Sequence, residues 1–273
     1  MSERSEDMSV TGRIAGPDDA PALVLLGSVG STTEMWTPIM APLAERFRVV
    51  RIDHRGHGMS PASPVGAPCT LAHLGREVIA ALDDLGLGRV NLAGLSLGGM
   101  VGMWLAVHRP ERIARLGLLC TSAFLPPAQG WLDRAAAVRA DGMSAIASAV
   151  VARWITADLA AREENLVNEL HTMVGSVDAE SYAQCCEAIA AMDLRTDLGR
   201  IAAPTLVIAA AQDPATPPEH GRVIADGVPG ARLEIIDAAA HVAPLEQPGP
   251  IARLLSEHLS FERDRPGNNS DET

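Results

Sequence analysis

The sequence predicts an α/β fold in which a mostly parallel β-sheet carries helices on both faces. Short, mostly apolar runs alternate with segments of helical length along most of the 273 residues. Such runs are typical of strands that are covered on both sides. The alternation stops only between residues 122 and 195, where alanine and other helix formers dominate. A chain of this order indicates a parallel sheet with an all-helical insertion.

The first part of the chain supplies five predicted strands and three predicted helices. Gly86 is a suitable C-cap for the second helix, and Pro110 prevents the third from continuing. The strands are expected at residues 10–14, 22–26, 48–52, 89–93 and 113–120, and the helices end near residues 46, 85 and 108.

The insertion and the last part of the chain complete the predicted architecture. Breaks at Pro126-Pro127, Gly142 and Gly175 divide the insertion into about four helices. The alternation then resumes, with strands at 204–210 and 232–236 and helices at 218–226 and 248–259. We therefore expect a core made of residues 8–121 and 196–261, a helical cap at 122–195, and a disordered polar tail at 262–273.

The overall composition excludes several classes of function. A hydrophobic content of 47% is sufficient for a large core, yet no apolar run reaches the roughly 18–20 residues of a membrane span. The polar, acidic first residues are the opposite of a signal peptide, so a cytoplasmic protein is expected. The net charge of −12 argues against nucleic acid and anionic membranes as partners. No feature of the sequence indicates an oligomeric state.

The four cysteines lack the spacing of metal ligands. They are Cys69, Cys120, Cys185 and Cys186, and they fall in or beside apolar stretches, where small core residues are expected. We therefore expect these cysteines to pack in the core rather than to bind a metal or act in redox chemistry.

The residues from 91 to 100 are the most informative stretch. A buried strand leads into Gly94-Leu95-Ser96-Leu97-Gly98 and then into a helix. In this strand-turn-helix pattern the serine adopts strained dihedral angles that expose its hydroxyl, and the flanking glycines leave room for the turn. Because Gly-x-Ser-x-Gly also occurs by chance in loops, the pattern needs support from other residues.

That support comes from a histidine and an aspartate that follow strands. His241 lies directly after the last predicted strand, and Asp213 follows the strand at 204–210. The carboxyl ends of parallel strands meet at one edge of a sheet, so Ser96, Asp213 and His241 are expected together there. The order Ser, Asp, His differs from that of trypsin-like and subtilisin-like enzymes. We predict a nucleophile, an acid and a base, respectively.

The remaining histidines have less specific interpretations. His54 and His57, in the loop after the third strand, could simply form hydrogen bonds within that loop. His73 begins a predicted helix. The other four lie in predicted helices and are His108, His171, His220 and His258.

A serine nucleophile also needs two N–H groups that stabilise the oxyanion. One is expected to be the backbone N–H of Leu97, next to Ser96. The other should come from the glycine-rich loop at 27–33, where position favours Val29. A flexible turn is the alternative interpretation of that loop.

Several short segments carry a resemblance to a known family. They are GSVGS at 27–31, EMW at 34–36, DHRGHG at 53–58, GLSLGGM at 94–100, RW at 153–154, YAQCC at 182–186, AMDLR at 191–195, DPATPP at 213–218, and His241. On these segments the chain resembles α/β-hydrolases from about residue 10 to 260, and within that superfamily it is similar to the 3-oxoadipate enol-lactonases. It departs from their usual residue pair at Ser28-Val29, and it has Ala210 where glycine is common.

The resemblance implies hydrolysis of a small carboxylate-bearing lactone through an acyl-enzyme, a reaction that needs neither a metal nor an organic cofactor. Trp131 and Trp154 are then expected to line the pocket, and Arg134, Arg139 or Arg153 to hold the substrate carboxylate, with Arg134 preferred. An exposed helix face is the alternative for each arginine. Another carboxylesterase, lactonase or C–C hydrolase on the same scaffold is the nearest alternative function. A non-catalytic ligand-binding relative is the alternative from another class.

Overall fold

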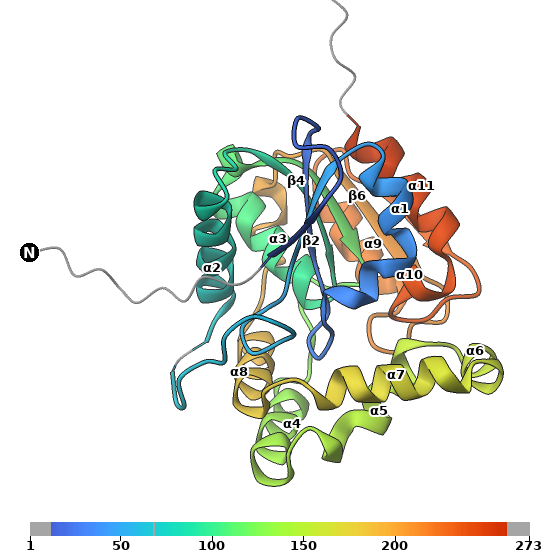
Figure 1. The fold of residues 1–273 in the computed structure, drawn as a ribbon. Helices are drawn as coiled ribbons and strands as arrows, with labels where there is room; N and C mark the ends of the chain where they lie inside the picture. Colours follow the sequence, from blue (N-terminus) through green and yellow to red (C-terminus); the bar gives the residue numbers. More distant parts are fainter. Residues whose placement is uncertain (1–11, 68, 261–273) are drawn as a thin grey trace, which may run out of the picture.

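The computed structural model describes residues 12–67 and 69–260, and within them seven strands form one sheet in the order β1-β3-β2-β4-β5-β6-β7 (Figure 1). β1 runs antiparallel to β3, and all other neighbours are parallel. The prediction of a mostly parallel α/β sheet is confirmed. The strands are β1 (Gly12–Ala15), β2 (Ala22–Leu26), β3 (Arg48–Ile52), β4 (Val90–Leu95), β5 (Ile113–Leu119), β6 (Thr205–Ala210) and β7 (Arg232–Ile236).

Helices cover both faces of this sheet. Leu116 and Leu118 of β5 lie against Gly102 of α3, whereas Gly117 between them lies against Leu255 of α11. Because successive side chains of a strand point to opposite faces, α3 and α11 cover opposite sides. α2 packs on α3, and α1 packs on α11. These helices and their neighbours are α1 (Thr37–Ala44), α2 (Leu71–Asp84), α3 (Leu97–His108), α9 (Pro218–Gly227) and α11 (Pro248–Leu259).

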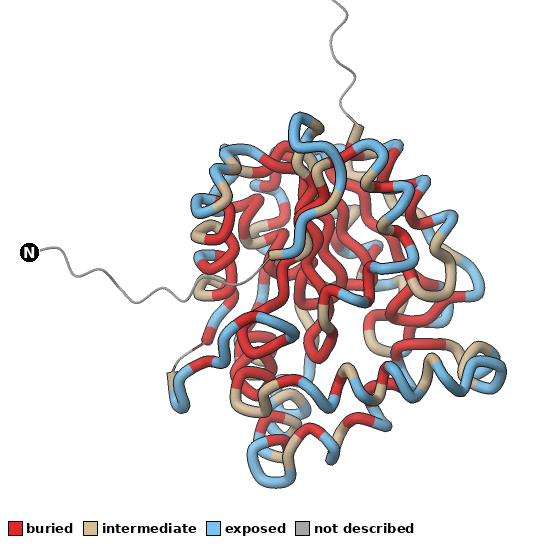
Figure 2. Tube along the Cα trace, in the orientation of Figure 1, coloured by how far each residue is buried: buried red, intermediate tan, exposed pale blue. Residues whose placement is uncertain are grey.

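The core lies along the central strands. Every residue of β4 and of β6 is buried, whereas the edge strands β1 and β7 contain exposed residues (Figure 2). Burial on both faces is the reason that the central strands appear in the sequence as continuous apolar runs.

The insertion between β5 and β6 contains five helices in the described part of the chain, one more than the breaks at Pro126-Pro127, Gly142 and Gly175 predicted. The extra element is the short α6, whose N-cap Thr156 accepts a hydrogen bond from the Leu159 amide. We call these helices the cap; they form a layer below the sheet in Figure 1. They are α4 (Ala128–Asp141), α5 (Ser144–Trp154), α6 (Ala157–Arg162), α7 (Glu164–Gly175) and α8 (Ala179–Ala190).

The ends of the chain differ slightly from the prediction. The first strand begins at Gly12, and the predicted residues 10 and 11 lie outside the described residues, as does the tail at 262–273. A short helix that the sequence did not predict, α10 (Ala243–Glu246), follows the loop of His241. Among the described residues, none of the helices combines the length and the apolar character that a membrane span needs.

Candidate active site

Ser96 lies at the turn between β4 and α3, in a conformation that is rare for a residue with a side chain. Its φ is +55° and its ψ is −116°. A Cβ on Gly94 would lie 2.2 Å from the carbonyl oxygen of Gly98, and a Cβ on Gly98 would lie 2.2 Å from that of Leu26. Both positions therefore require glycine. Such a backbone costs about 1–3 kcal/mol, which the surrounding packing must offset.

Asp213 and His241 form the second part of the site. The Nδ1–H of His241 donates to Oδ2 of Asp213 over 2.8 Å, and both side chains are buried. The carboxylate also accepts hydrogen bonds from the amides of Ala215 and Thr216 and from the Thr216 hydroxyl. Burial alone would raise the pKa of Asp213, but His241 and these donors outweigh it and the pKa is lowered. Asp213 is therefore held as a carboxylate.

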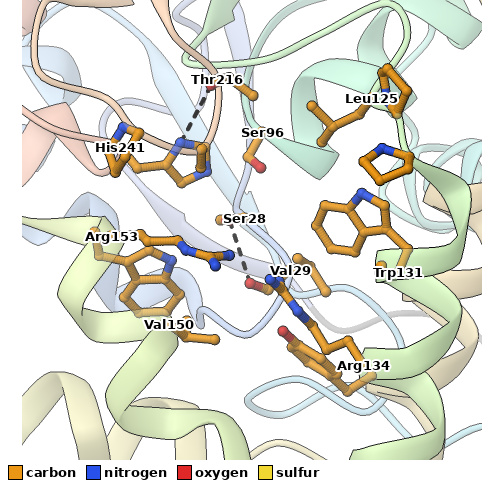
Figure 3. Close-up of a pocket in the computed structure, with 17 residues that line it drawn as sticks. Ser28, Val29, Ser96, Leu125, Trp131, Arg134, Val150, Arg153, Thr216 and His241 are labelled. Atoms are coloured by element: carbon orange, nitrogen blue, oxygen red, sulfur yellow. Dashed lines mark hydrogen bonds between the residues drawn. The ribbon is translucent and has the colours of Figure 1, made fainter.

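Ser96 and His241 line one cavity of about 480 Å³ between the sheet edge and the cap (Figure 3). The predicted substrate-binding residues Trp131, Arg134 and Trp154 all line it as well. The structure thus brings together residues from the loops after β2, β4, β6 and β7 with residues of α4 and α5.

Two arginines point into this cavity. In the view of Figure 3, Arg134 comes from the side of Trp131, and Arg153 from the side of His241. The Arg134 guanidinium carbon lies 4.6 Å from the centre of the Trp131 ring, a cation–π arrangement. Among the described residues, those that line the cavity include no aspartate or glutamate. Two positive charges therefore face the cavity, and no acidic side chain of this described lining neutralises them.

Arg139 is not part of the cavity, contrary to one of the alternatives left open by the sequence. Its guanidinium instead forms ion pairs with Glu180 and Glu187 on α8, at 2.7 and 2.5 Å. It joins two cap helices rather than facing a ligand.

The two expected oxyanion donors, the amides of Val29 and Leu97, stay a prediction. Val29 lines the same cavity as Ser96, and Leu97 is the first residue of α3. In the part of the chain that the structure describes, no acceptor takes the backbone N–H of either residue.

The structure adds two residues that sequence reasoning missed. Thr216 is one, through its hydrogen bonds to Asp213. Glu246 is the other: it accepts from the amide of Ala240, next to His241, and from the amide and hydroxyl of Thr156 in the cap. Thr216 could have been found from its place three residues after the acid, where short polar residues close turns. Nothing in the sequence near Glu246 indicated its role.

Two other histidines and the four cysteines have structural surroundings that explain them without a catalytic role. His54 donates through Nε2 to the Gly27 carbonyl, and His57 contacts the backbone of Arg55 and Gly30. Only the contact of His57 with Arg55 lies within their own loop, and the other two join that loop to the one at 27–33. The four cysteines are buried, and none lines the cavity. Among the described residues, no group of three or more histidine, cysteine or acidic side chains could hold a metal ion.

Comparison with known proteins extends this picture. A family model described as the α/β-hydrolase fold matches residues 21–248. The chain is 37% identical to 3-oxoadipate enol-lactonase 2 of Acinetobacter baylyi over 244 residues, which cover 89% of this chain and 90% of that protein. It is 29% identical to RutD of Stutzerimonas stutzeri, whose name suggests carbamate hydrolysis, over 89% of this chain and 92% of that one.

Among solved structures, the enol-lactonase of Burkholderia xenovorans LB400 superposes with a TM-score of 0.89 at 37% identity, over 92% of this chain and 96% of that one. The fold, the family model and these relatives agree with one another. The chain belongs to the α/β-hydrolase family and is an ester-hydrolysing enzyme.

Proposed function

We propose that this protein is a serine hydrolase that opens 3-oxoadipate enol-lactone to 3-oxoadipate, a step of aromatic catabolism in the β-ketoadipate pathway, in the cytoplasm. The observation that carries the proposal is a cavity whose described lining holds Ser96, His241 and two arginines but no carboxylate. The enol-lactonases among its relatives support the same substrate.

In this proposal His241 is the base and Asp213 fixes its tautomer. The Asp213 carboxylate only accepts hydrogen bonds, so the contact at 2.8 Å places a proton on Nδ1 of His241. Nε2 then carries a lone pair and removes the proton of the Ser96 hydroxyl as its oxygen attacks the lactone carbonyl. Asp213 stabilises the imidazolium that forms.

The N–H groups of Val29 and Leu97 then receive the negative charge on the former carbonyl oxygen. Collapse of the tetrahedral intermediate breaks the ring C–O bond, and the departing enolate takes the proton from the His241 imidazolium, which makes His241 neutral again. The acyl group stays on Ser96 until His241 removes a proton from a water that attacks the acyl carbon. The second tetrahedral intermediate then collapses, the proton passes from His241 to the Ser96 oxygen, and 3-oxoadipate is released. We infer no cofactor for these steps.

Arg134 is the proposed anchor of the substrate carboxylate, with Trp131 and Trp154 enclosing the ring. A guanidinium matches a carboxylate with two parallel hydrogen bonds, and the stacked Trp131 restricts its orientation. We assign residues 122–195 the role of a cap over a core made of residues 8–121 and 196–261. The hydrogen bond from the Val242 amide to the Trp154 carbonyl, 2.8 Å, ties the cap to the loop of the base.

The test compares turnover of the enol-lactone with turnover of a panel of uncharged lactones and aryl esters. We expect the enol-lactone to be preferred, Ser96→Ala to abolish all turnover, and Arg134→Met to lower kcat/KM for the enol-lactone alone. Arg139→Met is the matched control, because Arg139 lies on the same helix outside the cavity. Preference for the uncharged panel, or for a carbamate, would refute the enol-lactone as the substrate. A protein without any turnover would refute catalysis and leave a ligand-binding relative.

A further inference from the structure

The Val29 amide belongs to a peptide group whose opposite end is held by Ser31. The carbonyl of Ser28 accepts a hydrogen bond from the Ser31 hydroxyl at 2.8 Å and another from the Ser31 amide at 3.1 Å. The Ser28–Val29 peptide bond is trans, so its C=O and N–H point in opposite directions. Holding the carbonyl on the Ser31 side therefore directs the Val29 N–H away from Ser31.

His57 holds the next peptide group of the same loop. The Gly30 amide donates to Nε2 of His57 over 2.9 Å, and Nδ1 of His57 lies 2.8 Å from the Arg55 carbonyl oxygen. An amide can only donate and a carbonyl can only accept, so the partners themselves require a proton on Nδ1 and a lone pair on Nε2. The ring is fully buried, and it fits this position only as a neutral imidazole.

The loop is also fastened to the helix that carries the second oxyanion donor. The Gly27 carbonyl accepts from the Gly98 amide, in the first turn of α3, and from Nε2–H of His54, each at 3.0 Å. The Leu97 amide precedes Gly98 by one residue. The positions of the two oxyanion donors, Val29 and Leu97, are thus set relative to each other through one carbonyl.

The segment that carries His57 is itself held by the cap. The Gly56 carbonyl accepts from the Asp178 amide at the start of α8, 2.9 Å away. A Cβ on Gly56 would lie 2.2 Å from the Ser181 side chain, so helix and segment are in close contact. His57 therefore lies between the cap and the loop at 27–33, and each of its ring nitrogens has a backbone partner.

We propose that His57 and Ser31 are positioning residues of the oxyanion hole: they fix the two consecutive peptide groups that flank Val29, and so aim its N–H at the charge that develops beside Ser96. The inference rests on the proposed function. Neither side chain need touch the substrate, because each acts through the backbone of residues 28–30. We expect the two side chains to stabilise the transition state rather than the bound substrate, because the carbonyl oxygen of the ground state carries little charge.

The experiment measures kcat and KM for a substrate, together with the affinity of a boronic acid, whose tetrahedral adduct with a serine puts an oxygen in the oxyanion hole. Ser31→Ala removes one hydroxyl, and His57→Leu removes the acceptor for Gly30. Deleting an oxyanion donor costs about 10²–10³ in kcat, so misdirecting one should cost about tenfold or more, with KM within about twofold. Boronate affinity should fall in parallel.

His57→Gln separates a positioning role from mere filling of space. A glutamine offers an oxygen to the Gly30 amide and an N–H to the Arg55 carbonyl, so it should recover most of kcat and of the boronate affinity. His108→Gln, an exposed residue of α3, is the control for loss of a histidine.

The outcomes distinguish this inference from the proposed function. If Ser96→Ala keeps full activity, the proposed function fails. If Ser96→Ala is inactive while Ser31→Ala and His57→Leu keep wild-type kcat and boronate affinity, the positioning role is overturned and the proposed function stands. Should His57→Leu not fold, which circular dichroism will show, Ser31→Ala decides by the same criterion.

Discussion

Two buried neutral histidines should make this protein sensitive to mild acid. Burial lowers the pKa of His54 to about 3 and that of His57 to about 4, from an ordinary value of 6.5. Protonation of His57 would turn Nε2 into a donor facing the Gly30 amide, which is also a donor. Protonation of His54 would add a charge beside His57, whose ring centre is 6.1 Å away. In mild acid the two histidines therefore stay neutral in the native state but become protonated in the unfolded chain.

The sign and size of the effect follow from linkage. Both folded pKa values lie below the unfolded one, so the stabilisation is complete above about pH 6.5 and is lost as the pH falls toward 4 and then 3. In that window each histidine can lower the free energy of unfolding by up to about 1.4 kcal/mol for every pH unit of acidification. The pair should therefore lower it by about 2 kcal/mol between pH 6 and pH 5. That is a large share of the roughly 5–15 kcal/mol by which a domain is stable.

The assay is urea unfolding at pH 7, 6 and 5, compared between the wild-type protein and His57→Gln. The comparison matters because burial raises the pKa of Asp53, and a raised carboxyl pKa makes the native state more stable as the pH falls, opposite in sign to the effect of the histidines. Asp53 is present in both proteins, as are Asp178 and Arg55, the other charged groups around His57. The variant should lose about 1 kcal/mol less per pH unit than the wild type. Parallel pH profiles would refute the reasoning.

Three further substitutions test other parts of the structure. Thr216→Val removes the hydroxyl that donates to Asp213, so kcat should fall several-fold, by about 1 kcal/mol, at constant melting temperature; an unchanged kcat would make that hydroxyl dispensable. Arg55→Met deprives the buried Glu77 carboxylate of its guanidinium and should cost about 3–5 kcal/mol in urea unfolding, so a loss under about 1 kcal/mol would contradict this estimate. Gly98→Ala places a methyl carbon against a carbonyl oxygen and should abolish turnover of an aryl ester; wild-type turnover would show that the turn can adapt.

Much of the fold could be predicted because the central strands are buried on both faces. That burial produces the apolar runs, and the runs in turn place Ser96, Asp213 and His241 after strands that end at one edge. The structure accordingly brings Asp213 and His241 into hydrogen-bond contact. Contacts between segments far apart in the chain could not be predicted. The pair of Thr156 and Glu246, 90 residues apart, leaves no local pattern.

The cap arginines show why side-chain roles on an amphipathic helix are hard to assign from sequence. Arg134 follows Trp131 by three residues on α4, so the two share a face, about 60° apart around the axis. Arg139 is five residues beyond Arg134 and therefore points about 140° away. The periodicity separates these arginines correctly, but only the packing of α4 against α8 decides which of the two faces lines the cavity.

The charge of the whole protein and the charge of the cavity have opposite signs, and the proposed reaction gives this a consequence. The chain carries a net charge of −12, whereas the cavity presents Arg134 and Arg153 with no acidic side chain among the described residues that line it. Screening in cell-like salt limits the influence of exposed charges to about 8 Å, so a substrate inside the cavity responds chiefly to the arginines. Ring opening turns a monoanion into a dianion. Each turnover of the proposed reaction therefore ends with a ligand that the two arginines hold more strongly than they hold the substrate.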